Sequence, residues 1–133
     1  MYEDCLKRGA YREIAINEDK IKSAKENAAT MISAAKKLST ILDNDEEEWL
    51  SVFLGSYDAL HLQAEAFLRS KGLRASDHKC LFAYVKKQTN ITGFEKLRKA
   101  RNDTHYYGKK MLTKELRKLS EEAQQLYEQM AKL

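Results

Sequence analysis

The chain has 133 residues, 43% of them hydrophobic and 33% charged, and its net charge at neutral pH is +4. This length fits a single domain spanning 1–133, and the hydrophobic share is enough for a buried core. Because the chain holds no proline and only five glycines, a loop-rich fold is disfavoured and long helices are favoured.

Targeting signals and cysteine usage narrow the setting. No window approaches about 18 consecutive apolar residues, so neither a transmembrane helix nor a membrane partner is expected. The N-terminus carries Glu3 and Asp4 and lacks an apolar segment, which argues against a secretory signal and for a cytoplasmic protein. Cys5 and Cys80 form neither a CxxC pair nor a zinc spacing, so we expect two reduced cysteines with no shared role.

The first half of the chain predicts three helices. Residues 3–15 carry apolar side chains at four-residue intervals, which favours a first helix. Asn17 can cap a second helix, whose apolar stripe continues to Leu42. Asn44 then opens a third helix, which ends before Gly72 because glycine readily adopts the left-handed conformation that follows a helix. This third helix has the widest apolar face and is expected to be the most buried.

The second half predicts a short helix and a long one. Ser76 can cap a helix over 77–87, and the pattern T-x-x-E at 92–95 fits a capping box that opens the last helix. A helix from there to the end of the sequence would measure about 60 Å, so we expect a bend or break near Gly108, or a projecting tail. From Leu112 to Leu133 its apolar residues repeat at intervals of three and four, which predicts a regular apolar seam. Antiparallel packing through short loops predicts an all-α, up-down bundle of four to five helices.

Positive charge is concentrated near the start of that last helix. Residues 94–118 contain nine Lys or Arg against three acidic residues, a net of +6, whereas residues 43–48 read DNDEEE. A local basic excess can attract phosphate groups. The alternative interpretation is an ordinary solvated helix face.

A polar cluster lies within this basic segment. Arg98, Arg101 and His105 fall on one face of a helix, and Asn102 lies beside them. An Arg can hold a phosphate through two hydrogen bonds, and a His can move a proton near neutral pH. The cluster could therefore support metal-free attack on an RNA phosphodiester by its own 2′-hydroxyl, or it could only fix the helix register. Further candidates for binding are Lys109, Lys110, Tyr106 and Tyr107.

Two stretches of the sequence resemble the HEPN family. Residues 56–85, SYDALHLQAEAFLRSKGLRASDHKCLFAYV, resemble its buried helix, its Lys-Gly turn and the Ser-Asp-His-Lys start of its next short helix. Residues 101–110, RNDTHYYGKK, resemble the signature near the start of its last long helix. The resemblance implies a bundle of four or five helices that forms a homodimer, with the last long helices of the two protomers facing each other.

The same resemblance implies two classes of function. Active HEPN members are metal-independent ribonucleases with a composite site at the dimer interface, and many are toxins whose antitoxin is a minimal nucleotidyltransferase. Their motif places a His four to six residues after an Arg. Here six residues separate Arg98 from His105, three separate Arg101 from His105, and Tyr106 occupies the four-residue position.

The alternative function is a non-catalytic HEPN module that binds a nucleotide or a nucleotidyltransferase partner, with a tyrosine near the motif as a modification target. A purely structural helical bundle is the third possibility. No cofactor and no metal is expected, because His61, His78 and His105 lack a metal-binding spacing with carboxylates. His61 is interpreted as a core histidine and His78 as a capping or packing residue.

Overall fold

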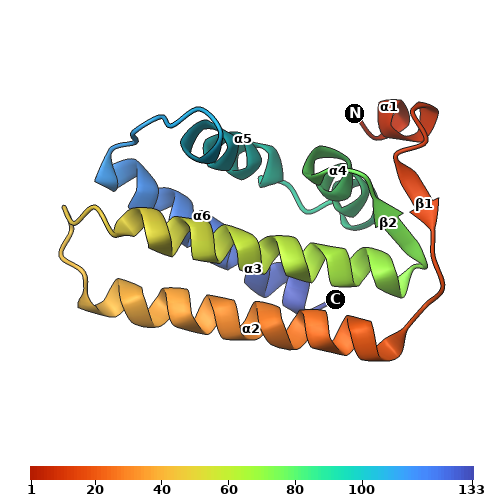
Figure 1. Cartoon of the computed structure of the whole chain (residues 1–133), viewed down its shortest axis with the longest axis horizontal. Helices are drawn as coiled ribbons and strands as arrows, with labels where there is room; N and C mark the ends of the chain where they lie inside the picture. Colours follow the sequence, from red (N-terminus) through yellow and green to blue (C-terminus); the bar gives the residue numbers. More distant parts are fainter.

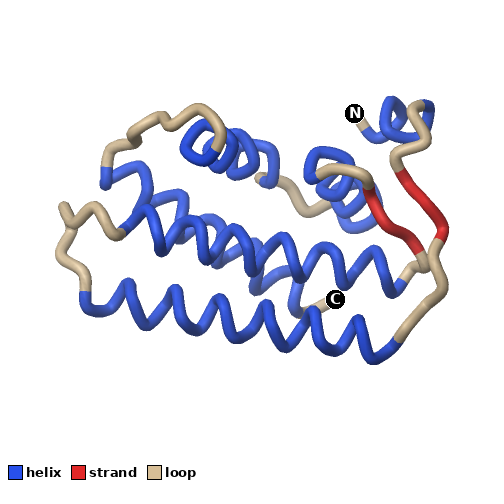
Figure 2. The backbone as a smooth tube through the Cα atoms, in the orientation of Figure 1, coloured by secondary structure: helices blue, strands red, loops and turns tan.

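A computed structural model describes all 133 residues and shows six helices with one small two-stranded antiparallel sheet (Figure 1). The strands occupy only a short part of the backbone, as Figure 2 shows. The expected all-α helical bundle is confirmed. In chain order the elements are α1 (Tyr2–Lys7), β1 (Tyr11–Glu13), α2 (Glu18–Ile41), α3 (Trp49–Ser70), β2 (Leu73–Ala75), α4 (His78–Thr89), α5 (Phe94–His105) and α6 (Thr113–Ala131).

Three long helices form the body of the bundle. α2 and α3 are an antiparallel pair, and α6 packs against α3 (Figure 1). α6 runs in the same direction as α3: the Arg117 guanidinium lies 5.8 Å from the centre of the Trp49 ring near the start of both helices. About two turns further along each helix, the Gln124 amide donates to the Ser56 hydroxyl. This direction is possible because α4 and α5 cross over α3 on the side away from α2 (Figure 1).

α3 is the most buried helix, as expected, but it begins at Trp49 and the predicted start at Asn44 is wrong. The acidic run before it folds into turns instead. There the Asp43 amide donates to the Glu46 carboxylate, and the Trp49 indole donates to the Asp43 carbonyl at 2.8 Å. The side chains of α3 with no exposed surface are those of Val52, Phe53, Ser56, Tyr57, Ala59, Leu60, Ala64 and Ala66.

The N-terminal segment does not form the single helix predicted over 3–15. α1 ends at Lys7, and Gly9 adopts a φ of +66°, a left-handed conformation that interrupts a helix. β1 then pairs antiparallel with β2, which places Arg12 directly opposite Arg74. Of the apolar residues at four-residue intervals, Leu6 lies in α1, whereas Ala10 lies just before β1 and Ile14 just after it.

A disulfide joins Cys5 of α1 to Cys80 of α4, so the prediction of two separate reduced cysteines is wrong. Pairing of β1 with β2 brings α1 next to the start of α4. Two residues that are 75 positions apart in the sequence thereby come together. Arg8, which follows α1, pairs with Asp77 at 3.2 Å across the same junction. The N-terminus is thus held against the beginning of α4.

The helix ends partly match the predictions. Asn17 caps α2 by accepting a hydrogen bond from a backbone amide of the first turn, as predicted. α4 is capped in the same way by Asp77 and not by Ser76. The capping box predicted at 92–95 does not form, because Gly93 precedes α5 with a φ of +109° and no side chain caps that helix.

The C-terminal helix is broken, as expected near Gly108. α5 ends at His105 and α6 begins only at Thr113, with Gly108 at a φ of +61° between them. In α6 the predicted apolar seam is buried from Leu116 to Met130. Leu112, which was expected in the same seam, precedes the helix and is 69% exposed.

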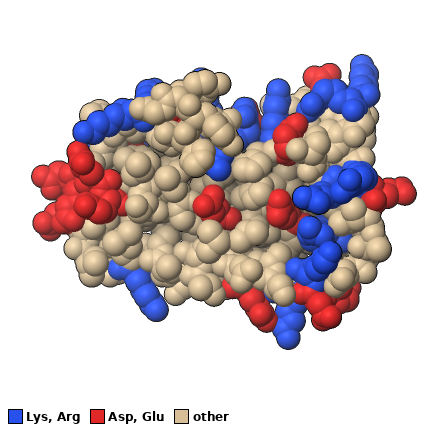
Figure 3. Space-filling model, in the orientation of Figure 1, with Lys and Arg blue, Asp and Glu red and all other residues tan.

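The surface charges are unevenly distributed. Figure 3 shows acidic side chains gathered at the end of the molecule where α2 leads into α3, and many basic side chains, with acidic ones among them, at the opposite end near β1 and β2. The acidic end corresponds to residues 43–48. None of the six helices has both the length and the apolar character that a membrane crossing requires.

Candidate functional site

Four of the predicted site residues line one concavity on the surface. Its volume is about 360 Å³, and it lies between the start of α4 and the second half of α5. α5 positions the predicted residues, and the capped first turn of α4 forms the opposite wall. The lining residues are Asp77, His78, Lys79, Arg98, Arg101, Asn102 and Tyr106. We call this concavity the Arg101 pocket.

Arg101 is the central cation of the pocket. One of its guanidinium nitrogens donates to the Tyr106 hydroxyl at 3.2 Å, and the group lies 5.2 Å from the Tyr106 ring centre and 5.9 Å from that of Tyr57. Two aromatic rings therefore hold it in place. No carboxylate lies within 4 Å of it, although seven ion pairs form elsewhere in the molecule. Because a guanidinium carries five N–H donors, most of those of Arg101 remain available to a ligand.

Arg98 is in a different state, because its guanidinium is already paired. It forms a two-point hydrogen-bonded ion pair with Glu95, one turn earlier in α5. The hydrogen bonds from Arg98 hold the pKa of the Glu95 carboxyl below its usual range. Arg98 thus adds a charge that is paired at close range to the pocket wall, whereas Arg101 has no carboxylate within 4 Å.

His105 does not share the pocket with the arginines. It is the last residue of α5, its side chain is exposed, and its ring lies edge-on to Tyr106 with the ring centres 5.0 Å apart. Because the helix ends there, the face shared by Arg98, Arg101 and His105 does not continue toward Lys109. His105 is therefore presented at the rim of the molecule, next to the α5–α6 loop.

The remaining predicted binding residues lie in that loop and point outward. Tyr106 and Tyr107 are 67% and 80% exposed. Lys109 is exposed without a carboxylate partner, and Lys110 pairs with Glu47 at 3.0 Å across from the α2–α3 connection. Of these four residues, only Tyr106 touches the Arg101 pocket.

Two histidines that were assigned structural roles lie next to Arg101. The Tyr57 hydroxyl is 3.0 Å from Nδ1 of His78, and the His61 and His78 rings lie with their centres 3.8 Å apart. The pKa of both imidazoles is lowered to about 4, mainly by burial, and the positive charge of Arg101 contributes to this lowering. Both are therefore neutral at pH 7. His61 packs largely inside the protein, as interpreted, whereas His78 forms part of the pocket wall.

Asp58 adds an acidic group beside this cluster. Burial raises the pKa of its carboxyl, while the positive charge of Arg101 acts in the opposite direction. Asp58 and Tyr57 were missed as site residues because their helix pattern marks them only as part of α3. The Ser-Asp-His-Lys segment did carry a signal for the opposite wall of the pocket, because it forms the capped start of α4, which lies beside α5.

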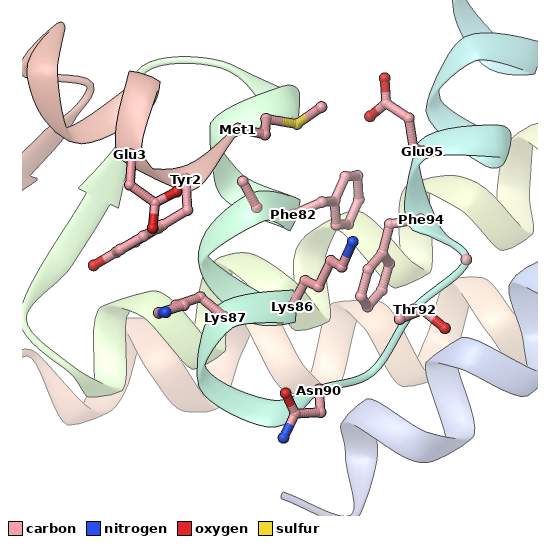
Figure 4. Close-up of a pocket in the computed structure, with 12 residues that line it drawn as sticks. Met1, Tyr2, Glu3, Phe82, Lys86, Lys87, Asn90, Thr92, Phe94 and Glu95 are labelled. Carbon is pink, nitrogen blue, oxygen red and sulfur yellow. The ribbon is translucent and has the colours of Figure 1, made fainter.

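A larger cavity, of about 450 Å³, lies away from this site between α1, α4 and α5 (Figure 4). Its floor includes Phe82 and Phe94, whose rings stack with centres 4.9 Å apart, and Lys86 and Lys87 extend along it. Both phenylalanines are only 3% exposed, so their stacking mainly stabilises the core. None of the predicted site residues lines this cavity.

No three His, Cys, Asp or Glu side chains lie together as ligands for a metal ion. Comparison with known proteins identifies no relative: no family model matches the chain, and neither a curated protein nor a solved structure matches it. The chemistry of the site therefore has to be judged from its own residues. Those residues offer a partly exposed guanidinium without a counter-ion, neutral imidazoles beside it and a third imidazole at the rim.

Proposed function

We propose that the chain is a HEPN-like protein that binds RNA through the Arg101 pocket and cleaves it without a metal ion. The observation that carries this proposal is Arg101 itself. Its guanidinium is oriented by Tyr57 and Tyr106 and has no carboxylate partner. A fixed guanidinium with free donors suits a phosphate, which it can hold through two parallel hydrogen bonds.

Cleavage requires proton transfers as well as phosphate binding. In the proposed step a base removes the proton of an RNA 2′-hydroxyl, and that oxygen attacks the neighbouring phosphorus. The bond from phosphorus to the 5′-oxygen breaks, and an acid returns a proton to this leaving oxygen. The products are a 2′,3′-cyclic phosphate and a 5′-hydroxyl. We assign one of the two proton transfers to His105.

His105 lies outside the pocket of its own chain, and this favours a site shared between two protomers. The exposed apolar residues around it are Tyr106, Tyr107 and Leu112, each at least 67% exposed. A cluster of this kind fits a contact with a second copy. In such a homodimer, His105 of one chain would complete the Arg101 pocket of the other.

The experiment is an RNA cleavage assay with a chelator present, together with a measurement of mass in solution. Wild type should cleave and leave a 2′,3′-cyclic phosphate. His105→Ala should lose about 10²–10⁴-fold in rate, the usual contribution of acid–base catalysis. Arg101→Ala should lose about 10²–10³-fold, the usual contribution of a positioned charge.

Lys25→Ala is a suitable control, because Lys25 is exposed on α2 and pairs with no carboxylate. It removes one positive charge and should leave the rate unchanged. The proposal fails if folded wild-type dimer does not cleave a panel of single-stranded RNAs. It also fails if the Arg101 and His105 variants cleave as fast as the control.

A second candidate function is favoured by the exposed tyrosines. Tyr107 is 80% exposed and makes no hydrogen bond, so its hydroxyl is accessible to a partner enzyme. In this case the chain is a non-catalytic partner of a minimal nucleotidyltransferase, and a tyrosine of the α5–α6 loop receives the nucleotide. Mass spectrometry after incubation with such an enzyme and ATP tests it: Tyr107→Phe should abolish the added mass if this residue is the acceptor.

A further inference from the structure

A second basic concavity adjoins the Arg101 pocket. It has a volume of about 190 Å³ and lies between the end of α3, β2 and the start of α4. The two concavities share Asp77 and His78 in their walls. They therefore form neighbouring parts of one surface depression that passes across the first turn of α4.

The far part of this depression is built around arginines that have no partners. Arg69 and Arg74 line it, and neither lies within 4 Å of a carboxylate. Arg12 of β1 stands directly opposite Arg74 of β2 and likewise forms no ion pair. Residues directly opposite in an antiparallel pair share a face, and like charges in this arrangement repel each other. A bound anion would relieve the repulsion.

The acidic groups of the same region do not cancel these charges. Asp77 is paired with Arg8 and accepts a hydrogen bond from the α4 backbone. Glu65 is the other carboxylate of the wall, and it lies 3.5 Å from His61, whose imidazole is neutral at pH 7. One carboxylate without a charged partner thus lines this concavity together with Arg69 and Arg74. Arg12 stands opposite Arg74 on the same face of the sheet, and Arg101 lies on the other side of His78.

We infer that the ligand of the Arg101 pocket is a single RNA strand that continues past His78, so that Arg69, Arg74 and Arg12 hold the phosphates that follow. This inference rests on the proposed function and adds the substrate class. A mononucleotide would occupy only one of the two concavities. A flexible single strand can follow the depression over the α4 turn and place successive phosphates in both concavities.

The test measures binding of a fluorescein-labelled hexauridylate with 2′-O-methyl groups, which cannot undergo the cleavage step, and of uridine 3′-monophosphate as the short probe. The variants are wild type, Arg69→Ala/Arg74→Ala, Arg101→Ala and Lys25→Ala, each checked by circular dichroism. The double variant should weaken hexauridylate binding at least about tenfold and leave uridine 3′-monophosphate binding unchanged. Its plot of log affinity against log salt should flatten by about 1.4, or about 0.7 for each lost phosphate contact.

Two outcomes separate this inference from the proposed function. In the first, Arg101→Ala weakens binding of both probes and Arg69→Ala/Arg74→Ala weakens neither. The RNA strand then does not reach β1 and β2, and the inference is overturned, although the Arg101 pocket remains a phosphate site. If the double variant weakens hexauridylate binding and Arg101→Ala changes nothing, the path proposed through the Arg101 pocket is equally overturned. Loss in both variants on the long probe, and in Arg101→Ala alone on the short probe, is the supporting result.

Discussion

The His61–His78 pair predicts a specific dependence of stability on pH. The pKa of His61 is about 4 in the folded protein, against about 6.5 in an unfolded chain. Both states are neutral above pH 7, so the pair contributes no pH dependence there. Below pH 6.5 the unfolded imidazole binds a proton that the folded one rejects, so the free energy of unfolding falls as the pH falls toward 4.

The size of this effect follows from the two pKa values. Between pH 7 and pH 5, one imidazole with these values lowers the free energy of unfolding by about 1.8 kcal/mol. The side chain of His61 is only 18% exposed, so solvent screening removes little of this amount. His78 carries the same lowered pKa and contributes a second, smaller loss because more of it faces water.

The perturbation that isolates the effect is His61→Phe, which keeps an aromatic ring beside Phe82 and removes the titrating group. Urea unfolding at pH 7, 6 and 5 gives the free energy for both proteins. Any difference in packing between the two proteins that does not depend on pH cancels when the slopes of their free energies of unfolding against pH are compared. The variant should lose at least about 1.5 kcal/mol less than wild type over this range. Parallel pH profiles for the two proteins would refute the assignment of a neutral, buried imidazole pair.

Other predictions concern the frame that holds the site. Reducing the Cys5–Cys80 disulfide should lower the free energy of unfolding by about 2–5 kcal/mol, and urea curves that do not move with reductant would contradict this. Asp77→Ala should cost about 1 kcal/mol through loss of the α4 cap, and an unchanged melting temperature would argue against it. Gly93→Ala should cost at least about 1 kcal/mol, because its φ of +109° strains any side chain. Gly55 lies within α3, where an added methyl group would make an ordinary van der Waals contact with Ala35, so Gly55→Ala should instead stabilise the protein by about 0.5–1 kcal/mol. Equal effects of the two glycine substitutions would exclude the backbone explanation.

The long helices were predictable because their apolar residues repeat with the helical period. The seam from Leu116 to Met130 and the cap at Asn17 are local features, and both are found where they were expected. The N-terminal segment failed for the same reason: 3–15 has a helical spacing, but pairing with β2 and the turn at Gly9 override it. The partner strand is some 60 residues away, and local periodicity contains no information about it.

The site was predicted in part. The structure places Arg101 and Asn102, which the sequence groups in one cluster of α5, in the wall of one pocket. The continuation of this face past His105 to Lys109 was left open, because a bend or break in the helix was expected near Gly108. The end of α5 at His105 separates them. The groups that surround Arg101, above all Tyr57 and His78, come from other elements and become neighbours only through the crossing of α4 over α3.

The disulfide shows the same limit. Spacing rules apply to cysteines that are close in sequence, and Cys5 and Cys80 are not. Their bond depends on the pairing of β1 with β2, which brings α1 to the beginning of α4. Disulfides of this kind are typical of oxidising environments. Titration of free thiols in the unfolded, unreduced protein therefore tests whether the two cysteines are bonded, and with that bond the placement of α1 beside α4.

The central claim is that Arg101 is the phosphate-binding group of an RNA site, and the most direct test compares it with its paired neighbour. Binding of a 2′-O-methyl RNA is measured over a range of salt concentrations for wild type, Arg101→Ala and Arg98→Ala. We predict that Arg101→Ala weakens binding by about tenfold or more and flattens the salt dependence by about 0.7, while Arg98→Ala, whose charge is compensated by Glu95, has a clearly smaller effect. Equal affinities and equal salt slopes for wild type and Arg101→Ala would contradict the claim.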